Sequence, residues 1–233
     1  METQAAVSNP TDGAEVDPPP RIERIDLTAR IVFGVAAAIL LVLAVRAPLW
    51  TSDLNAPQYP DGLDLRIYGS VAEGDVVQGD IAEITELNHY VGMKPYDSGE
   101  IPEIKLWIPT MAAALIAVVL STIFGRRLIG RLARLAIWLI PVGVLLDIQF
   151  RLYQFGHDLV TDPRPALPLD PFTPKVVGPT KVLNFTNFAL PGIGLVYVWL
   201  AAALLTFGPW IVHKIATREP KPAVEEPAGA AVA

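Results

Sequence analysis

The chain has 233 residues, 52% of them hydrophobic and 18% charged, and its mean hydropathy of +0.41 is too high for an ordinary soluble domain. Its net charge of −6 excludes the basic surface that nucleic-acid binding requires, and the absence of cysteine excludes disulfides, c-type haem attachment, cysteine-ligated iron–sulfur clusters and thiolate metal sites. The composition predicts an α-helical integral membrane protein with sizeable polar connections and no nucleic-acid partner.

Four apolar segments predict four transmembrane helices, at residues 29–49, 108–125, 132–148 and 189–212. A helix needs about 20 residues to cross a bilayer. The first apolar run, Ile31 to Val45, reaches that length if Arg46 snorkels to the interface beside Trp50. A cleaved signal peptide is the alternative, but about thirty mostly polar residues precede the run and Arg46-Ala47-Pro48 is a poor cleavage site. We therefore expect a retained anchor.

Proline and glycine mark two of these segments. Pro141 lies inside the third and predicts a kink, because proline removes one hydrogen bond from the helix ladder. The fourth contains Gly192 and Gly194 near its start, which would permit close helix packing or simply give a flexible beginning.

The distribution of arginine sets the expected orientation. The short connection 126–131 and its flanks, from Gly125 to Arg134, carry four arginines and no acid. The positive-inside rule places this connection in the cytoplasm, so both chain termini are cytoplasmic as well. The long connections 50–107 and 149–188 are then extracytoplasmic. The first of them holds eleven acidic residues against three basic ones, as expected for an external loop.

The two tails, residues 1–28 and 213–233, are expected to be disordered cytoplasmic segments. Both are rich in proline and small or polar residues, so neither buries enough apolar surface to offset the entropy of ordering.

The two long connections are expected to form a small mixed α/β domain outside the membrane. Leu63 to Gly69 alternates apolar and polar residues, which predicts a half-buried strand. Asp80 and Glu83 have capping-box spacing, and the residues that follow place Ile81, Ile84, Asn88 and Val91 on one helical face. The second connection is rich in proline, which predicts an extended chain that packs on the first.

A candidate metal site comes from His89 and Met93, which stand four positions apart, together with His157 in the second connection. Imidazole and thioether are soft neutral ligands that suit copper, particularly Cu(I). The alternative is structural: His89 bonds a neighbouring backbone group and Met93 packs in the loop core, with Gly92 ending the helix between them. A b-type haem held by the two histidines is less favoured, because both lie outside the apolar spans. No cofactor is certain from the sequence.

A strip of ionisable residues begins at Asp147 and Arg151 and continues through His157 to Asp158. Ionisable groups at membrane depth are functional candidates, although an ion pair four residues apart near the interface is the simpler interpretation. An imidazole and a carboxylate beside aromatic side chains would also suit a quinone pocket. Motifs of hydrolases, kinases and nucleotide-driven pumps are absent, which favours a non-enzymatic protein.

Three sequence blocks resemble those of a known family. They are LWTSDLNAPQYPDGL at 49–63, LNHYVGMK at 87–94 and FGHDL at 155–159, where the family pattern has tyrosine in place of Phe155. The blocks resemble the NosB-type family, small multi-pass membrane proteins encoded beside clade II nitrous oxide reductases. The resemblance covers residues 30–212.

The resemblance implies a role in nitrous oxide respiration at the bacterial cytoplasmic membrane. One function is a non-enzymatic accessory protein that supports copper-centre maturation of a periplasmic nitrous oxide reductase, or docks to the reductase or its maturation proteins. The other is a membrane subunit that passes electrons from quinol through a pocket near Asp147, Arg151 and His157. The lack of a haem or cysteine motif counts against the second, because one-electron steps need a carrier. The family supplies no ligand set, so His89, Met93 and His157 rest on their residue types alone.

Overall fold

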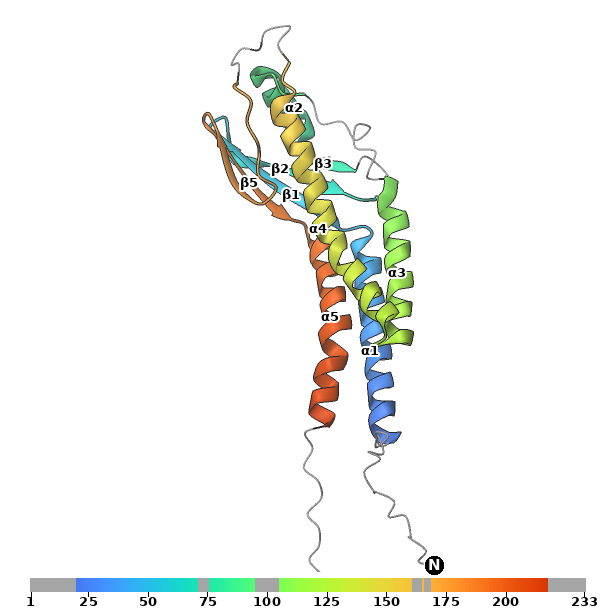
Figure 1. Cartoon of the computed structure of the whole chain (residues 1–233). Helices are drawn as coiled ribbons and strands as arrows, with labels where there is room; N and C mark the ends of the chain where they lie inside the picture. The colour runs from blue at the N-terminus through green and yellow to red at the C-terminus, as the bar shows by residue number, and fades with distance from the viewer. Residues whose placement is uncertain (1–19, 71–75, 95–104, 161–164, 166–168, 218–233) are drawn as a thin grey trace, which may run out of the picture.

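The structure is a computed structural model, and it describes residues 20–70, 76–94, 105–160, 165 and 169–217. Within these residues the chain forms five α-helices and five strands (Figure 1). In chain order these are α1 (Pro20–Ala44), β1 (Pro48–Ala56), β2 (Tyr59–Tyr68), β3 (Val77–Gly79), α2 (Ile81–Val91), α3 (Trp107–Phe124), α4 (Leu128–His157), β4 (Gly178–Val182), β5 (Phe185–Pro191) and α5 (Ile193–Ala216).

Four helices, α1, α3, α4 and α5, are long and apolar enough to cross a membrane. They form a bundle whose core includes Leu41, Met111, Ile137, Leu195 and Val198, each almost completely buried. The outside of the bundle is also apolar: Ile123 and Leu146 are each 65% exposed. A bundle that is apolar both inside and outside is compatible with contact with a lipid bilayer.

The first helix lies further toward the N-terminus than expected. α1 begins at Pro20, so residues 20–28 are helical although they were expected in the disordered tail. Proline is well tolerated in the first turn of a helix, where its missing amide hydrogen has no intrahelical partner. The helix ends at Ala44 and not at 49, because the chain from Pro48 pairs as β1. At the other end of the chain, α5 runs to Ala216, so residues 213–216 are helical although they were expected in the disordered C-terminal tail. The remaining tail residues, 1–19 and 218–233, lie outside the described residues.

The helix α4 is longer than the expected segment 132–148, since it runs from Leu128 to His157. The last nine of its residues contain no proline, and Leu152 packs with Ile148 into the core beneath the sheet. Thirty residues span about 45 Å, against about 30 Å for the hydrocarbon of a bilayer. The end of α4 therefore projects beyond the bundle and supports the sheet, as Figure 1 shows.

The five strands form one antiparallel sheet in the order β3-β2-β1-β5-β4. The predicted strand Leu63–Gly69 is confirmed up to residue 68 within β2. β1 follows α1, and β5 leads directly into α5, so the central strand pair continues the packed pair of helices α1 and α5. Residues 189–191 were expected in the fourth helix but belong to β5. We call the sheet, α2 and the last turns of α4 the sheet unit.

The two glycines at the start of α5 allow its close approach to the end of β1. A Cβ atom added at Gly192 would lie 2.1 Å from the carbonyl oxygen of Pro48, and one at Gly194 would lie 2.9 Å from the same oxygen. The amide of Gly192 also donates to the carbonyl of Leu49 at 2.8 Å. The glycines therefore serve close packing, between a helix start and a strand, and not a flexible beginning.

The proline-rich connection packs against both the first connection and α4. The indole nitrogen of Trp50 donates to the carbonyl of Val176 at 2.8 Å. The side chain of Gln149 donates to the carbonyl of Pro174 and accepts from the amide of Val176, each at 2.9 Å. The extended segment 174–176 is thus held by side chains, which replace the backbone ladder that Pro174 disfavours.

Candidate functional site

The helix α2 ends in a turn that fixes where Met93 lies relative to His89. Gly92 is left-handed, with φ of 80°, and its amide donates to the carbonyl of His89. The amide of Met93 donates to the carbonyl of Asn88 at 2.8 Å. This pair of bonds is a Schellman motif, which reverses the chain after the helix. Met93 is therefore no longer on the helical repeat, and the expected four-residue spacing with His89 does not place both side chains on one helical face.

The predicted apolar face of α2 is confirmed, but its capping box is not formed. Ile84, Asn88 and Val91 are buried, as expected. The carboxylate of Asp80 makes no cap to its own helix and instead accepts from the amide of Asp64 in β2, at 2.8 Å. Asp80 therefore ties α2 to the sheet.

The structure brings the second and third resemblance blocks together. The amide of Val160, just after the FGHDL block, donates to the carbonyl of Gly92 at 2.7 Å. Beside it, the ammonium group of Lys94 lies 2.5 Å from the carboxylate of Asp158. Segments more than 60 residues apart thus meet at the tip of the sheet unit, through one backbone bond and one ion pair.

The three candidate copper ligands do not share a cavity. His89 is exposed on α2, whereas Met93 lines a cavity of about 100 Å³ between α2 and the sheet, which neither histidine lines. His157 is exposed at the end of α4, where its ring stacks on Tyr153 and its Nδ1 lies 2.9 Å from the carbonyl oxygen of Tyr153. In the described part of the chain no three His, Asp or Glu side chains gather as a metal site would require. The residue types of the three candidates suit Cu(I).

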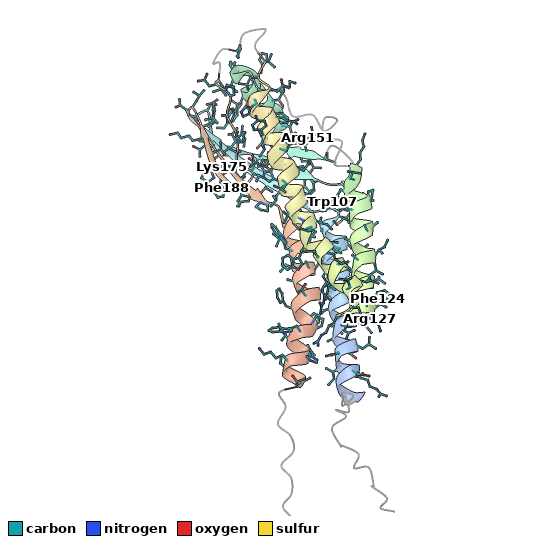
Figure 2. The ribbon with its side chains drawn as sticks, in the orientation of Figure 1. Trp107, Phe124, Arg127, Arg151, Lys175 and Phe188 are labelled. Carbon is teal, nitrogen blue, oxygen red and sulfur yellow. The ribbon has the colours of Figure 1, made fainter. Side chains whose placement is uncertain are left out.

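The residues of the polar strip lie in the second half of α4 and at its C-cap. Asp147 and Arg151 line a cavity of about 500 Å³. Most other lining residues are apolar and come from α3, α4 and the strand ends: Leu49, Trp50, Ile67, Leu106, Trp107, Ala136, Leu139, Ile140, Gly143, Val144, Ile148, Leu152 and Phe155, with Thr110. In Figure 2, Arg151 lies on α4 beside the sheet and Trp107 lies at the start of α3. An apolar cavity with two ionisable groups suits an amphiphilic ligand.

A second cavity, of about 410 Å³, adjoins the first, because Arg151 and Phe155 line both. Its other lining residues are Lys94, Tyr153, Gln154, His157 and Asp158. The guanidinium of Arg151 donates to the side-chain oxygen of Gln154 at 3.3 Å. Of the residues of the expected strip, Asp147 therefore lines the apolar cavity, His157 and Asp158 line the polar one, and Arg151 lines both.

Sequence reasoning did not single out Trp50, Trp107 or Gln149 as parts of this region. Trp107 is 4% exposed, donates to the carbonyl of Val45 at 3.2 Å, and packs on Gly69, where an added Cβ would lie 2.3 Å from the indole ring. Both tryptophans border apolar runs, which indicates membrane interfaces but gives no sign of a shared cavity. Their meeting depends on pairing between distant segments.

No protein-family model matches the chain, and no curated protein sequence matches it significantly.

Proposed function

We propose that the chain is a multi-pass protein of the bacterial cytoplasmic membrane, with the sheet unit outside and the chain termini in the cytoplasm. The exposed apolar surface of the four-helix bundle supports the membrane placement. The four arginines between Gly125 and Arg134 support the orientation, because they lie at and beside the turn between α3 and α4, on the side of the bundle away from the sheet unit (Figure 1). In Figure 2, Arg127 marks that turn.

We further propose that the protein is a non-enzymatic accessory protein of nitrous oxide respiration, whose sheet unit docks a periplasmic nitrous oxide reductase or its maturation proteins. The observation that carries this proposal is the joining of the two resemblance blocks by Gly92 with Val160 and by Lys94 with Asp158. The joint gives the sheet unit a defined surface at the end of the molecule furthest from the start of α1 and the end of α5 (Figure 1). His89 and Tyr90 are exposed beside it.

This proposal does not require the chain itself to hold copper. The client reductase contains copper, so an accessory protein supports it by holding the reductase or a copper-delivery protein at the membrane. Copper binding by His89, Met93 and His157 stays a separate prediction from the residue types alone.

The test is a strain that lacks the protein, complemented with variants. Whole-cell nitrous oxide reduction is measured together with the copper content of the isolated reductase. We expect His89→Ala combined with Tyr90→Ala to reduce the activity at least about tenfold, as for loss of a binding hot spot. Lys181→Ala, at an exposed position of β4 outside both resemblance blocks, is the matched control and should keep full activity.

The outcomes separate the possible roles. Reductase without copper places the chain in metal-centre assembly, and loaded but idle reductase places it in electron supply. Unchanged reduction in the deletion strain overturns the link to nitrous oxide. Equal activity of the His89/Tyr90 and Lys181 variants overturns the docking surface while leaving the wider role intact.

A second candidate function is the binding of quinol, which the 500 Å³ cavity favours. Its wall is apolar and includes Trp50, Trp107 and Phe155, while Asp147 and Arg151 supply polar groups that would fix a quinone head. The residues present would bind and orient the ring. The electron carrier that must follow would belong to another subunit, because the chain has no cysteine or c-haem motif.

Quinone binding can be measured with the purified protein in detergent. A short-chain naphthoquinone should quench the fluorescence of the two cavity tryptophans. Gly143→Leu is the sharpest variant, because Gly143 lines the cavity and a Cβ placed there meets no atom within 4 Å. We expect Gly143→Leu to weaken quenching about tenfold or more by filling the cavity, with thermal stability retained. Unaltered quenching in this variant would exclude the cavity as the binding place.

A further inference from the structure

A cavity of about 260 Å³ lies at the end of the bundle opposite to the sheet unit, and four arginines line it. They are Arg30 on α1, Arg126 in the turn between α3 and α4, and Arg131 and Arg134 on α4. In Figure 1, α1 and α5 continue past the turn at which the pair α3 and α4 ends. The longer helices supply one wall and the arginine-rich turn supplies the other.

Two of these guanidinium groups are positioned by a single glycine. The Nη1 atom of Arg134 donates to the carbonyl oxygen of Gly125 at 3.1 Å and lies 3.3 Å from the hydroxyl of Ser121. Arg30 packs on the same glycine, since a Cβ added at Gly125 would lie 2.3 Å from its Nη1. Gly125 has φ of 49°. Glycine at this turn therefore lets side chains from α1 and α4 meet.

Among the described residues that line the cavity, four arginines stand against one acidic residue, Asp26. Arg134 is close enough to Arg131 and Arg30 for their charges to repel. The one acidic residue that lines the cavity, Asp26, directs both carboxylate oxygens to His213 Nδ1, at 3.0 Å. Among the residues that the structure describes, no ion pair involves any of the four arginines. Gathering like charges in a partly enclosed space costs free energy unless an anion joins them.

We propose that this cavity binds a phosphate group. Guanidinium groups bind phosphate oxygens through paired, charge-assisted hydrogen bonds, and several of them around one cavity would enclose a single anion. Thr122 and Thr206 also line this space, and their hydroxyl groups donate to the backbone carbonyls of Val118 and Ala202, so the arginines are the groups that would hold the anion. Trp210 borders it, with the ammonium group of Lys214 4.9 Å from the centre of its ring.

The phosphate belongs to either of two sources, the headgroup of an anionic phospholipid or a soluble phosphate compound. The position favours the lipid. Arg30 directly precedes the apolar run of α1, and Trp210 lies near the end of that of α5, so both mark the boundary at which phospholipid headgroups lie. This preference rests on the proposed membrane placement, whereas the phosphate chemistry of the cavity does not.

The test uses the full chain in dodecyl maltoside micelles. Binding of phosphatidylglycerol with a fluorescent acyl chain is compared with binding of equally labelled phosphatidylcholine, and inorganic phosphate is added as a competitor. We expect phosphatidylglycerol to bind about tenfold or more tightly than phosphatidylcholine.

The variants Arg131→Gln and Arg134→Gln should each weaken this binding roughly tenfold or more. Arg127→Gln is the control, because it removes one charge from the same turn but Arg127 does not line the cavity. Its affinity should stay within about twofold of the parent. Arg131 is exposed, so its substitution leaves the folding of the bundle intact, which thermal unfolding checks.

Each result gives a definite answer. Selective loss of phosphatidylglycerol binding in the two variants identifies a lipid headgroup. Binding of inorganic phosphate that depends on Arg131 and Arg134, with no preference between the two lipids, identifies a soluble phosphate compound. Equal effects of Arg127→Gln and Arg131→Gln, or no binding of either phosphate source, overturn the site. The role in nitrous oxide reduction is measured separately in cells, so failure of one proposal does not decide the other.

Discussion

The amide nitrogen of Val160 lies 2.7 Å from the carbonyl oxygen of Gly92, and this hydrogen bond joins the two long connections. Gly92 ends α2, and Val160 follows the C-terminal end of α4. The same two turns carry Lys94 and Asp158, whose ion pair is largely exposed and contributes about 0–1 kcal/mol. The backbone bond and the packing around Gly92 are therefore the main structural link at this point.

Replacing Gly92 tests this link. Gly92→Ala must hold alanine at φ of 80°, with its Cβ 3.0 Å from both the carbonyl oxygen of Val160 and the side chain of Pro165. We expect a loss of about 1–3 kcal/mol in the free energy of unfolding. Gly143→Ala is the control, since Gly143 is helical and open, and alanine there should be neutral or stabilise by up to about 1 kcal/mol. Equal melting temperatures for the two variants would contradict this account.

The junction between β1 and α5 gives a stronger effect. In Gly192→Ala the new Cβ would lie 2.1 Å from the backbone oxygen of Pro48, which no side-chain rotation can relieve. The strand or the helix must move, and we expect a loss of about 3 kcal/mol or more. Thermal unfolding in detergent and the yield of folded protein measure it. A variant as stable as the parent would show that the two segments are not in close contact.

Trp50 should fix the proline-rich connection through its indole nitrogen. Trp50→Phe keeps an aromatic ring in the buried position but removes the donor to the carbonyl of Val176. We expect a loss of about 1–3 kcal/mol and faster proteolysis within residues 169–177. Trp210→Phe serves as the comparison, because Trp210 is 53% exposed, and it should leave the cleavage rate unchanged. Identical cleavage rates for the two variants would show that the hydrogen bond from Trp50 to Val176 does not hold the proline-rich connection in place.

Gln149 provides a pH-dependent test of the same connection. In Gln149→Glu an ionised carboxylate would still accept from the amide of Val176 but would face the carbonyl oxygen of Pro174 with no hydrogen to donate. The folded state then favours the protonated carboxyl, so its pKa rises above the ordinary value of about 4.3. We expect a loss of about 1–3 kcal/mol at neutral pH that diminishes as the pH falls through that raised pKa.

The control for this variant is Gln154→Glu, the same substitution on the exposed face of α4, where the side chain accepts from Arg151. Its stability should change by less than about 1 kcal/mol at either pH. A pH-independent loss for Gln149→Glu would point to a packing defect and not to the two hydrogen bonds.

The four long helices could be predicted because an apolar run is a local property of the sequence. The strand β2 could be predicted because Leu63 and Leu65 alternate with polar residues, and the structure shows both leucines buried. Sequence reasoning misplaced residues 189–191, since a short apolar run fits a helix or a buried strand equally well. These residues form a strand because they pair with β1, which lies far away in the sequence. The end of α4 was missed for a similar reason, because Leu152 is buried by a sheet assembled from distant segments.

The candidate site divides in the same way. The four-residue spacing of His89 and Met93 can be read from the sequence, and Gly92 between them indicates that the helix ends there. The meeting of Gly92 with Val160, the two adjoining cavities, and the convergence of Arg30 with Arg134 depend on tertiary contacts. Helical periodicity and local spacing do not contain that information.

The pairing of β1 with β5 also dictates an order of assembly. The hydroxyl of Ser52 donates to the side-chain oxygen of Asn187 across this pair, although 135 positions separate the two residues. The edge of β1 that pairs with β5 therefore stays unpaired until nearly the whole chain has been synthesised. An open edge invites pairing with other chains. The sheet is completed only when α5 stands beside α1. A complete sheet therefore forms only in a chain whose helices α1 and α5 are already packed together.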